Sequence, residues 1–357
     1  MERNSKIYVA GHKGLVGSAI WNNLLSKGYT NLVGKSIDEL NLCDAVAVKQ
    51  FFDTEKPEYV FLAAARVGGI MANNTYRADF IYENLQIQNN IIGESYRHNV
   101  KKLLFLGSTC VYPKNAIQPM PETELLTSEL EYTNEPYAIA KIAGLKMCES
   151  FSIQYGTNYI AVMPTNLYGP NDNFDLKCSH VLPAMIRKIY LGKCLMENNW
   201  DAIRSDLKKR PVEGVNNTNA DNEILSALNK YGIFKDTVRL WGTGVPLREF
   251  LWSEDMADAC VFVVENINFK DTFSVNEQEV RNCHINIGTG KEITIKDLSG
   301  LITKTVNYNG NIEFDSTKPD GTMRKLTNPS KLNKLGWKHK IELDEGIEKL
   351  YNWYLFN

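Results

Sequence analysis

Short apolar runs alternate with segments of helical spacing through the first half of the chain. The apolar runs are Ile7–Ala10, Leu32–Val33, Tyr59–Leu62, 103–106 and 159–163, and the segment 15–25 has helical spacing. A strand that is apolar at every position is buried on both faces, which is typical of a parallel sheet between two layers of helices. The pattern therefore predicts an α/β fold with a doubly wound parallel sheet.

The regular alternation ends after position 163. Pro164, Gly169 and Pro170 precede a polar stretch at 171–177, and such residues interrupt regular elements. We predict a first domain over 1–170, completed by returning segments from about 250–290, and a smaller α/β substrate-binding region over 171–357. Residues 197–235 are rich in Asn, Asp and Lys and are interpreted as an insertion. Such an insertion either reshapes a binding pocket or forms a surface ornament or oligomer contact.

Composition excludes several classes of protein. The chain has 357 residues, 43% hydrophobic and 23% charged, and its 40 Lys and Arg against 42 Asp and Glu leave a net charge of −2. There is thus no diffuse basic field for nucleic acid or an anionic membrane. The seven cysteines form no C-x-x-C pair and no zinc-spaced cluster, which predicts a reduced, cytoplasmic protein without a metal site. No apolar run is long enough to cross a bilayer.

Three glycines follow the first predicted strand directly. They lie in the segment GHKGLVG, which separates this strand from an amphipathic helix. Glycine allows a sharp turn and the close approach of a phosphate, and the N–H groups of a helix N-terminus bind phosphates. Outside this context the glycines would be ordinary turn residues, but strand, turn and helix together predict a dinucleotide site of the Rossmann type. Its residues are Gly11, His12, Lys13, Gly14, Leu15, Val16 and Gly17.

The tip of the second predicted strand indicates which dinucleotide binds. NAD-binding sites place an acid there for the ribose hydroxyl, whereas the 2′-phosphate of NADP requires cations. Lys35 lies at this tip, and Lys13 lies in the glycine turn. No Asp or Glu occurs between the second strand and Asp38. We therefore predict NADP(H); the alternative is that both lysines are solvated surface charges.

Tyr137 and Lys141 are four residues apart behind Pro136. Proline suits the first turn of a helix, so the two side chains share one helical face. An ammonium beside a phenol favours the phenolate, and the positive nicotinamide ring of an oxidised cofactor adds to this effect, which together predict a lowered pKa for Tyr137. Alone, the pair could be a surface i,i+4 contact. With Ser108 after the strand 103–106, however, the order of glycine turn, Ser and Y-x-x-x-K resembles the extended short-chain dehydrogenase/reductases.

The resemblance extends to the GDP-L-fucose synthase family and covers nearly the whole chain outside the insertion. The segments that resemble this family are 10–20, AAARVGGIMANNTYRADFIYE (63–83), LLFLGSTCVYP (103–113), NEPYAIAKIAG (134–144), MPTNLYGPNDNF (163–174), WGTGVPLREF (241–250) and KPDGTMRKL (318–326). It implies a homodimer that reduces a GDP-linked 4-keto-6-deoxy sugar at C4 with NADPH and epimerises it at C3 and C5.

The resemblance also implies roles for individual residues. Tyr137 would give a proton to the C4 oxygen, Ser108 would orient that oxygen, and Lys141 would support Tyr137 and bind the cofactor. Cys110 and His180 would form the epimerisation pair, although a lone Cys after a strand is usually core filling and a lone His at a helix start usually a surface residue. Further cofactor contacts would come from Leu106, Gly107, Pro164, Thr165, Asn166, Leu167 and His180. The sugar nucleotide would meet Lys188, Trp241, Arg248 and Asp320.

Three positions depart from the family pattern, which has Arg where this chain has Lys13, Ile37 and Lys188. The first two weaken the case for NADP, and the third replaces a forked phosphate ligand by a point charge. The insertion 197–235 has no counterpart in the shorter family members and lies between the segments of Lys188 and Trp241. Two alternatives therefore stay open beside the bifunctional enzyme. One is a C4-reductase of a related GDP-6-deoxy-4-keto sugar such as a heptose, and the other is a non-catalytic nucleotide sensor on the same fold.

Overall fold

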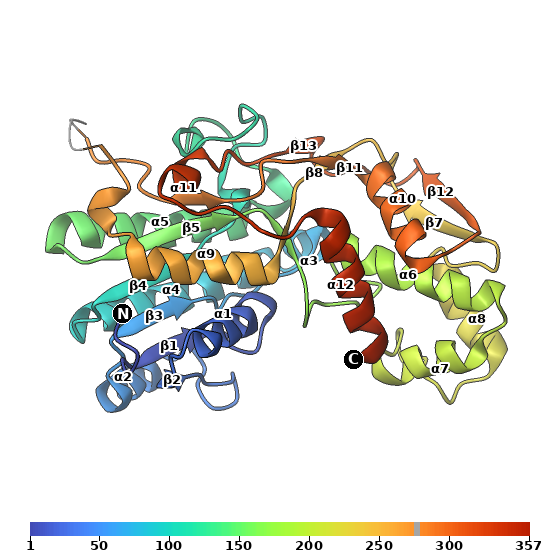
Figure 1. The fold of residues 1–357 in the computed structure, drawn as a ribbon, viewed down its shortest axis with the longest axis horizontal. Helices are drawn as coiled ribbons and strands as arrows, with labels where there is room; N and C mark the ends of the chain where they lie inside the picture. Colours follow the sequence, from blue (N-terminus) through green and yellow to red (C-terminus); the bar gives the residue numbers. More distant parts are fainter. Residues whose placement is uncertain (275–278) are drawn as a thin grey trace. The chain divides into compact units, whose positions relative to one another are not determined.

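The computed structural model describes residues 1–274 and 279–357 (Figure 1). The chain forms two compact units. Unit 1 contains Met1–Asn171, Glu249–Lys291 and Leu326–Glu342, and unit 2 contains Asp172–Arg248, Glu292–Lys325 and Leu343–Asn357. The return of Leu326–Glu342 to unit 1 has no signal in the hydrophobic pattern.

Among the described residues, unit 1 is built on a six-stranded sheet in which every neighbouring pair is parallel. In spatial order its strands are β10 (Ile285–Ile287), β5 (Tyr159–Pro164), β4 (Lys102–Leu106), β3 (Tyr59–Leu62), β1 (Ile7–Ala10) and β2 (Leu32–Val33). The chain proceeds from β1 to β2 on one side and to β3, β4 and β5 on the other. This doubly wound order confirms the predicted fold class, and its switch point lies between β1 and β3.

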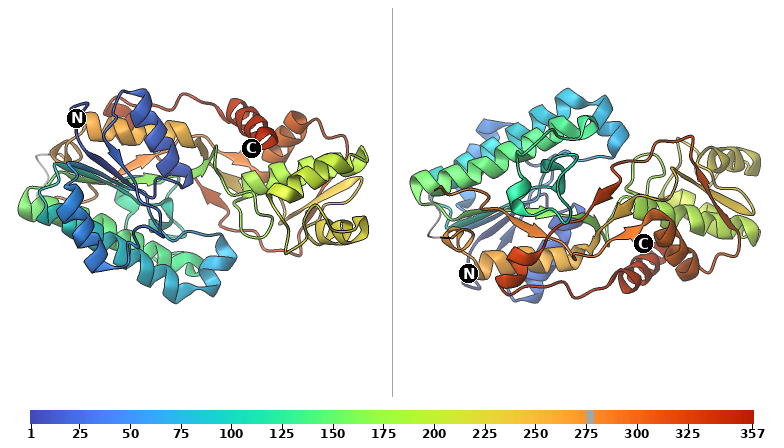
Figure 2. Two further views of the ribbon diagram at one scale, coloured as in Figure 1. Left: turned by 90° about the horizontal axis from the view of Figure 1, so that it is seen from below. Right: turned by 90° about the horizontal axis from the view of Figure 1, so that it is seen from above.

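Helices cover both faces of this sheet (Figure 2). One face carries α1 (Leu15–Ser26) and α9 (Ser253–Asn266), and the other carries α2 (Ala45–Glu55), α4 (Arg77–Arg97) and α5 (Glu135–Tyr155). Along β1, Ile7 and Val9 enter the first core while Tyr8 and Ala10 enter the second. Successive side chains of a strand point to opposite faces, so two cores require a strand that is apolar throughout.

Shorter elements complete unit 1. They are α3 (Ile70–Thr75), α11 (Ser330–Lys334), the 3₁₀ turns η1 (Thr109–Val111), η2 (Glu122–Glu124), η3 (Tyr132–Asn134) and η4 (Phe269–Asp271), and the parallel pair β6 (Asn166–Tyr168) and β9 (Phe250–Trp252).

Unit 2 combines helices with two small sheets. Its helices are α6 (Val181–Met196), α7 (Trp200–Lys209), α8 (Asp221–Lys230), α10 (Ile295–Val306) and α12 (Leu343–Phe356). Strand β7 (Thr237–Trp241) pairs in parallel with β12 (Asn311–Asp315), and β8 (Leu247–Arg248) lies between β11 (Ile293–Thr294) and β13 (Arg324–Lys325).

The insertion 197–235 contains α7 and α8 and shares a core with α6. Its residues Ile203, Leu207, Ile224 and Leu228 are fully buried in one cluster with Leu191 of α6. The insertion is therefore a packed part of unit 2 rather than a loosely attached surface loop.

Candidate active site

The glycine turn connects β1 to α1, and two of its glycines are required by the backbone itself. Gly11 has φ +82°, and a Cβ there would lie 2.8 Å from the backbone nitrogen of Ala64. A Cβ at Gly17 would overlap the carbonyl oxygen of Gly11. At Gly14, by contrast, the nearest atom to a Cβ is 3.5 Å away, an ordinary contact. The packing of the chain thus explains the first and third glycines but not the second.

The N-terminus of α1 is open to an anion. Gly14 is the N-cap residue, no described side chain caps the helix, and its first turn contains no acidic residue. The first N–H groups of a helix have no partners within the helix and carry partial positive charge. A phosphate group approaching Gly14 would meet these N–H groups, so the turn fits a dinucleotide.

His12 fills space beside this turn. Its ring lies 5.4 Å from that of Trp21 between centroids, and a Cβ at Gly34 would clash with it. Burial lowers the pKa of His12. The imidazole is therefore neutral at neutral pH and adds no positive charge to the site.

The tip of β2 holds an acid that the sequence analysis did not single out. Ser36 donates from both its backbone nitrogen and its Oγ to Glu39, each at 2.7 Å. These bonds lower the pKa of Glu39, and the charges of Lys35 and Lys13 lower it further. Both candidate phosphate ligands therefore lie near a carboxylate. Ile37 is 77% exposed.

The structure brings Ser108, Tyr137 and Lys141 together in unit 1. Ser108 follows β4 and begins η1, and a hydrogen bond joins its side chain to Tyr137. Lys141 lies one turn after Tyr137 on α5, with Nζ 5.8 Å from the phenol ring centroid. Its Nζ donates to the carbonyl oxygen of Leu106 at 2.7 Å. The three side chains thus gather at the carboxyl end of β4.

The pKa of Tyr137 shifts in the direction opposite to the prediction. Burial raises it, the neighbouring Cys110 raises it further, and the hydrogen bond with Ser108 only partly offsets these effects. Lys141 is 3% exposed, and burial lowers its pKa to about 7. The predicted lowering of the Tyr137 pKa was wrong for the chain by itself, because burial disfavours both the phenolate of Tyr137 and the ammonium of Lys141. Tyr137 therefore keeps its proton at neutral pH.

Cys110 lies in η1 beside these residues and is partly exposed. Its backbone nitrogen donates to Ser108 Oγ at 3.2 Å. Asn134, the last residue of η3, donates from Nδ2 to Cys110 Sγ at 3.2 Å. Cys110 is thus part of a polar cluster, unlike a core-filling cysteine.

The other candidate cofactor residues of unit 1 lie where β4 and β5 end. They are Leu106, Gly107, Pro164, Thr165, Asn166 and Leu167. The backbone of Gly107 donates to Val162 at 2.8 Å, and the side chain of Asn166 donates to the carbonyl of Glu249 at 2.8 Å. The carboxyl ends of parallel strands at a switch point are the usual place for a ligand in such sheets.

Glu249 is a further residue that the sequence analysis missed. Its carboxylate is fully buried and accepts from the backbone nitrogens of Thr289, Gly290 and Thr327 at 2.6, 2.7 and 2.8 Å. It therefore ties three distant segments together next to Asn166. No local pattern predicts such a contact.

In unit 2, two candidates lie on α6. His180 is its N-cap residue and is exposed, and partial desolvation by the surrounding protein lowers its pKa. Lys188 lies two turns further on, where burial lowers its pKa to about 8. An incompletely solvated ammonium on α6 is suited to an anionic ligand.

The remaining candidates surround the turn after β7. Trp241 is 61% exposed, with Lys318 Nζ 5.7 Å from its ring centroid. Asp320 accepts from the backbone nitrogen and Oγ1 of Thr243 at 2.9 and 2.7 Å. Burial lowers the pKa of Arg248, and the charge of Asp320 partly offsets this. Unit 2 thus brings an exposed aromatic ring, a cation and a carboxylate into one region.

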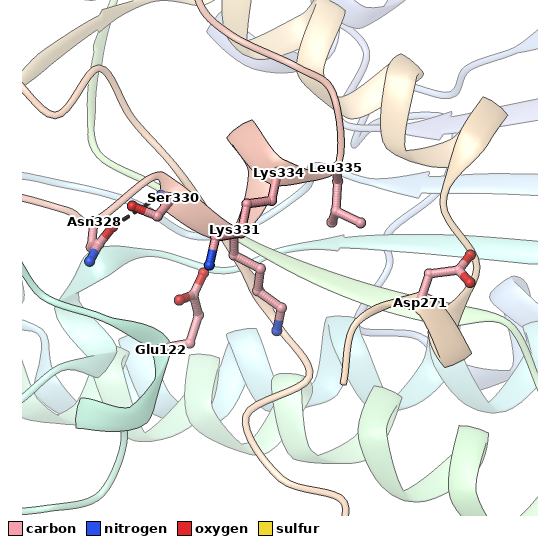
Figure 3. Close-up of a pocket in the computed structure, with 7 residues that line it drawn as sticks. All are labelled: Glu122, Asp271, Asn328, Ser330, Lys331, Lys334 and Leu335. Carbon is pink, nitrogen blue, oxygen red and sulfur yellow. Dashed lines mark hydrogen bonds between the residues drawn. The ribbon is translucent and has the colours of Figure 1, made fainter. Parts of the chain in front are cut away.

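A separate cavity of about 350 Å³ in unit 1 contains none of the candidate residues. It is lined by Glu122, Asp271, Asn328, Ser330, Lys331, Lys334 and Leu335 (Figure 3). Within residues 1–274 and 279–357, no group of three or more His, Cys, Asp or Glu side chains could hold a metal ion. None of the helices described is both long and apolar enough to span a bilayer.

The parallel sheet, the glycine turn and the Ser–Tyr–Lys cluster are the features of an extended short-chain dehydrogenase/reductase. Residues 7–207 and 211–288 match the NAD dependent epimerase/dehydratase family, and the chain belongs to that family.

Its similarity to GDP-L-fucose synthases, first indicated by the sequence blocks, is confirmed. It is 49% identical to GDP-L-fucose synthase 1 of Arabidopsis thaliana, covering 100% of this chain and 95% of that protein. It is 46% identical to GDP-L-fucose synthase of Escherichia coli strain K12, covering 99% and 97%.

Solved structures extend this similarity. A GDP-6-OMe-4-keto-L-xylo-heptose reductase from C. jejuni is 47% identical with a TM-score of 0.93, covering 99% of this chain and 98% of that one. A GDP-D-glycero-L-gluco-heptose synthase from Campylobacter jejuni, determined in the presence of NADPH, is 47% identical with a TM-score of 0.92, covering 99% of both chains.

Proposed function

We propose that this chain is an NADPH-dependent enzyme that reduces a GDP-4-keto-6-deoxy sugar at C4 and epimerises it at C3 and C5. The observation that carries the proposal is the cluster of Ser108, Tyr137, Lys141 and Cys110 at the carboxyl end of β4. The names of the curated relatives support the GDP sugar, and the related structure determined with NADPH supports the cofactor.

In the reduction, Tyr137 acts as the proton donor. Its raised pKa keeps the phenol protonated, so it can protonate the C4 oxygen as negative charge develops there. Ser108 orients that oxygen by a hydrogen bond. NADPH bound at the glycine turn supplies the hydride.

In the epimerisation, the C4 ketone makes the hydrogens at C3 and C5 acidic. The thiolate of Cys110 takes a proton from one of these carbons, and the electron pair passes into an enolate whose oxygen is bound by Ser108 and Tyr137. His180 is the proposed partner that supplies the second proton. Ser108 and Tyr137 thus serve both reactions, because the reduction and the epimerisation each require a polarised C4 oxygen.

The experiment is deuterium incorporation. The protein is incubated with GDP-4-keto-6-deoxy-mannose in deuterated water without NADPH, and deuterium at C3 and C5 is measured. Incorporation at both positions, followed by reduction when NADPH is added, is the expected result. Rapid reduction without incorporation would leave a C4-reductase only, and binding without turnover would identify a nucleotide sensor.

A heptose substrate is the second candidate. Two structures with TM-scores of 0.93 and 0.92 are named for GDP-heptose derivatives, and the insertion packs on α6, which carries Lys188. A panel of GDP-keto sugars with six and seven carbons, assayed with NADPH and NADH, separates the two substrate classes. A higher kcat/KM for the seven-carbon sugars would favour the heptose.

We also expect a cytoplasmic homodimer whose product enters polysaccharide biosynthesis. The helices α4 and α5 present exposed aromatic residues, among them Tyr96 and Tyr155 with ring centroids 4.5 Å apart. Such a surface suits a symmetric contact with a second copy. Light scattering would give the mass of the assembly, and a monomer at micromolar concentration would contradict this expectation.

A further inference from the structure

We propose that Asn134 is a positioning residue that stabilises the thiolate of Cys110 for proton abstraction. The inference rests on the proposed function, because it concerns the epimerisation step. Asn134 Nδ2 lies 3.2 Å from Cys110 Sγ as a hydrogen-bond donor. Its Oδ1 is buried and has no hydrogen-bond partner among the described residues, so the sulfur is the polar group toward which this amide is directed.

The usual reason for asparagine at this position is absent. Asn134 is the N-cap residue of α5, where an Asn side chain normally accepts from an N–H of the first turn. Here the side chain makes no such bond among the described residues. The side-chain amide of Asn134 therefore does not cap α5 and instead donates to Cys110.

The 3₁₀ turn that carries Asn134 is fixed in part by contacts with Arg77, the first residue of α4. The backbone nitrogen of Asn134 donates to Glu131 at 3.1 Å within η3. Arg77 donates to the carbonyl of Tyr132 at 2.7 Å, and its guanidinium lies 4.4 Å from the Tyr132 ring centroid. Arg77 also pairs with Glu135 at 3.5 Å. These contacts fix the amide, which is what a positioning role requires.

An amide donor changes the balance between thiol and thiolate. A hydrogen bond to a charged form favours that form, so the N–H of Asn134 stabilises negative charge on Sγ. The phenol of Tyr137 is a titratable neighbour of Cys110, and its raised pKa keeps it uncharged. The thiolate then takes the proton from C3 or C5, and His180, the partner proposed above, supplies the proton that the carbon receives when the enolate collapses.

The test compares Asn134→Ala with Asn134→Asp in the full-length protein. The first readout is the alkylation rate of Cys110 by iodoacetamide at pH 7, followed on its peptide by mass spectrometry so that other cysteines do not interfere. We expect about a tenfold loss in Asn134→Ala, the size expected for a hydrogen bond to a charged group. In Asn134→Asp the loss should be larger, because a carboxylate cannot donate and repels the thiolate.

The order of the two alkylation rates distinguishes an electrostatic role of Asn134 from a packing role. Asp has the shape of Asn, so a packing role predicts that Asn134→Asp resembles the wild type and that Asn134→Ala is worse. The matched control is Asn173→Ala, which removes a similar amide contact, from Asn173 Nδ2 to Cys178 Sγ at 3.4 Å. This control should leave the alkylation rate of Cys110 unchanged.

The second readout is deuterium exchange into the keto sugar without NADPH. Exchange should fall about tenfold in Asn134→Ala, and more than the rate of NADPH-dependent reduction of a pre-epimerised ketone. An unchanged alkylation rate in both variants would overturn the inference, as would the reverse order of the two variants. If the wild type neither exchanges nor reduces GDP-keto sugars, the proposed function fails, and the alkylation series still decides whether Asn134 stabilises the thiolate.

Discussion

Lys141 donates a hydrogen bond to the carbonyl oxygen of Leu106 at 2.7 Å and thereby ties α5 to the end of β4. The side chain is almost entirely buried. It has no described carboxylate partner, which is why burial lowers its pKa to about 7. The bond holds Tyr137 and Ser108 at a fixed separation, at the cost of burying an ammonium group.

This relationship predicts a pH dependence of stability. An unfolded lysine has a pKa near 10.4, so between about pH 7 and pH 10 the unfolded chain binds more protons than the folded chain, and stability rises with pH. We expect Lys141 to contribute about 2 kcal/mol of additional stability at pH 9 relative to pH 7. Urea unfolding at both pH values would show this gain in the wild type.

The control for this prediction is Lys141→Met, which retains the apolar volume without the titrating amine. Burial also lowers the pKa values of Lys102 and Lys188 to about 8. These lysines add a gain of the same sign in both proteins, so the wild type minus the variant isolates Lys141. An equal pH dependence in the two proteins would contradict the assignment.

Replacing Tyr137 by Phe tests the proton donor. The substitution removes only the hydroxyl, so NADPH should still bind while the rate of reduction falls about 10²–10⁴-fold, the usual contribution of a general acid. Stopped-flow NADPH oxidation gives the rate, and fluorescence titration gives the cofactor Kd. Retained turnover would exclude Tyr137 as the donor.

The three glycines of the turn should respond differently to alanine. Gly17→Ala places a methyl group against the carbonyl of Gly11 and should destabilise the fold by about 2 kcal/mol or more. Gly14→Ala has room in the chain, so its stability should change little while the Kd for NADPH rises about tenfold because the methyl group blocks the phosphate. Thermal unfolding and cofactor titration separate these effects, and an unfolded Gly14→Ala would refute the distinction.

Glu39 should weaken the selection of NADPH over NADH. Its carboxylate lies near Lys13 and Lys35, so Glu39→Gln should leave both lysines more available to a 2′-phosphate. We expect the KM for NADPH to fall about threefold at low salt while the KM for NADH changes little. Steady-state assays at two salt concentrations measure this, and an equal change for both cofactors would show that Glu39 has no part in the selection.

Much of unit 1 could be predicted from the sequence because its signals are local. The strands β1, β3, β4 and β5 are apolar on both faces, and the glycine turn is contiguous in the chain. The pair Tyr137 and Lys141 follows from the spacing of a helix. Each of these features depends on residues within about ten positions of one another.

The missed features depend on tertiary contacts. Glu39 interacts electrostatically with Lys13, which is 26 positions away in the sequence. Asn134 forms a hydrogen bond to Cys110, which is 24 positions away. The raised pKa of Tyr137 follows from burial, which spacing along a helix does not reveal. For the same reason no sequence pattern identified Glu249 as a link between distant segments.

The insertion should be essential to the stability of unit 2. Arg187 of α6 is 0% exposed and donates from Nε and Nη2 to Asp206 of α7 at 3.0 and 2.8 Å. Asp206→Asn would leave a buried guanidinium without its countercharge and should cost about 3–5 kcal/mol of unfolding free energy. Tyr354→Phe removes a single hydrogen bond to Asp206 Oδ1 and should cost only about 1 kcal/mol. Urea unfolding compares the two, and equal effects would indicate that the insertion is held by its apolar core rather than by this ion pair.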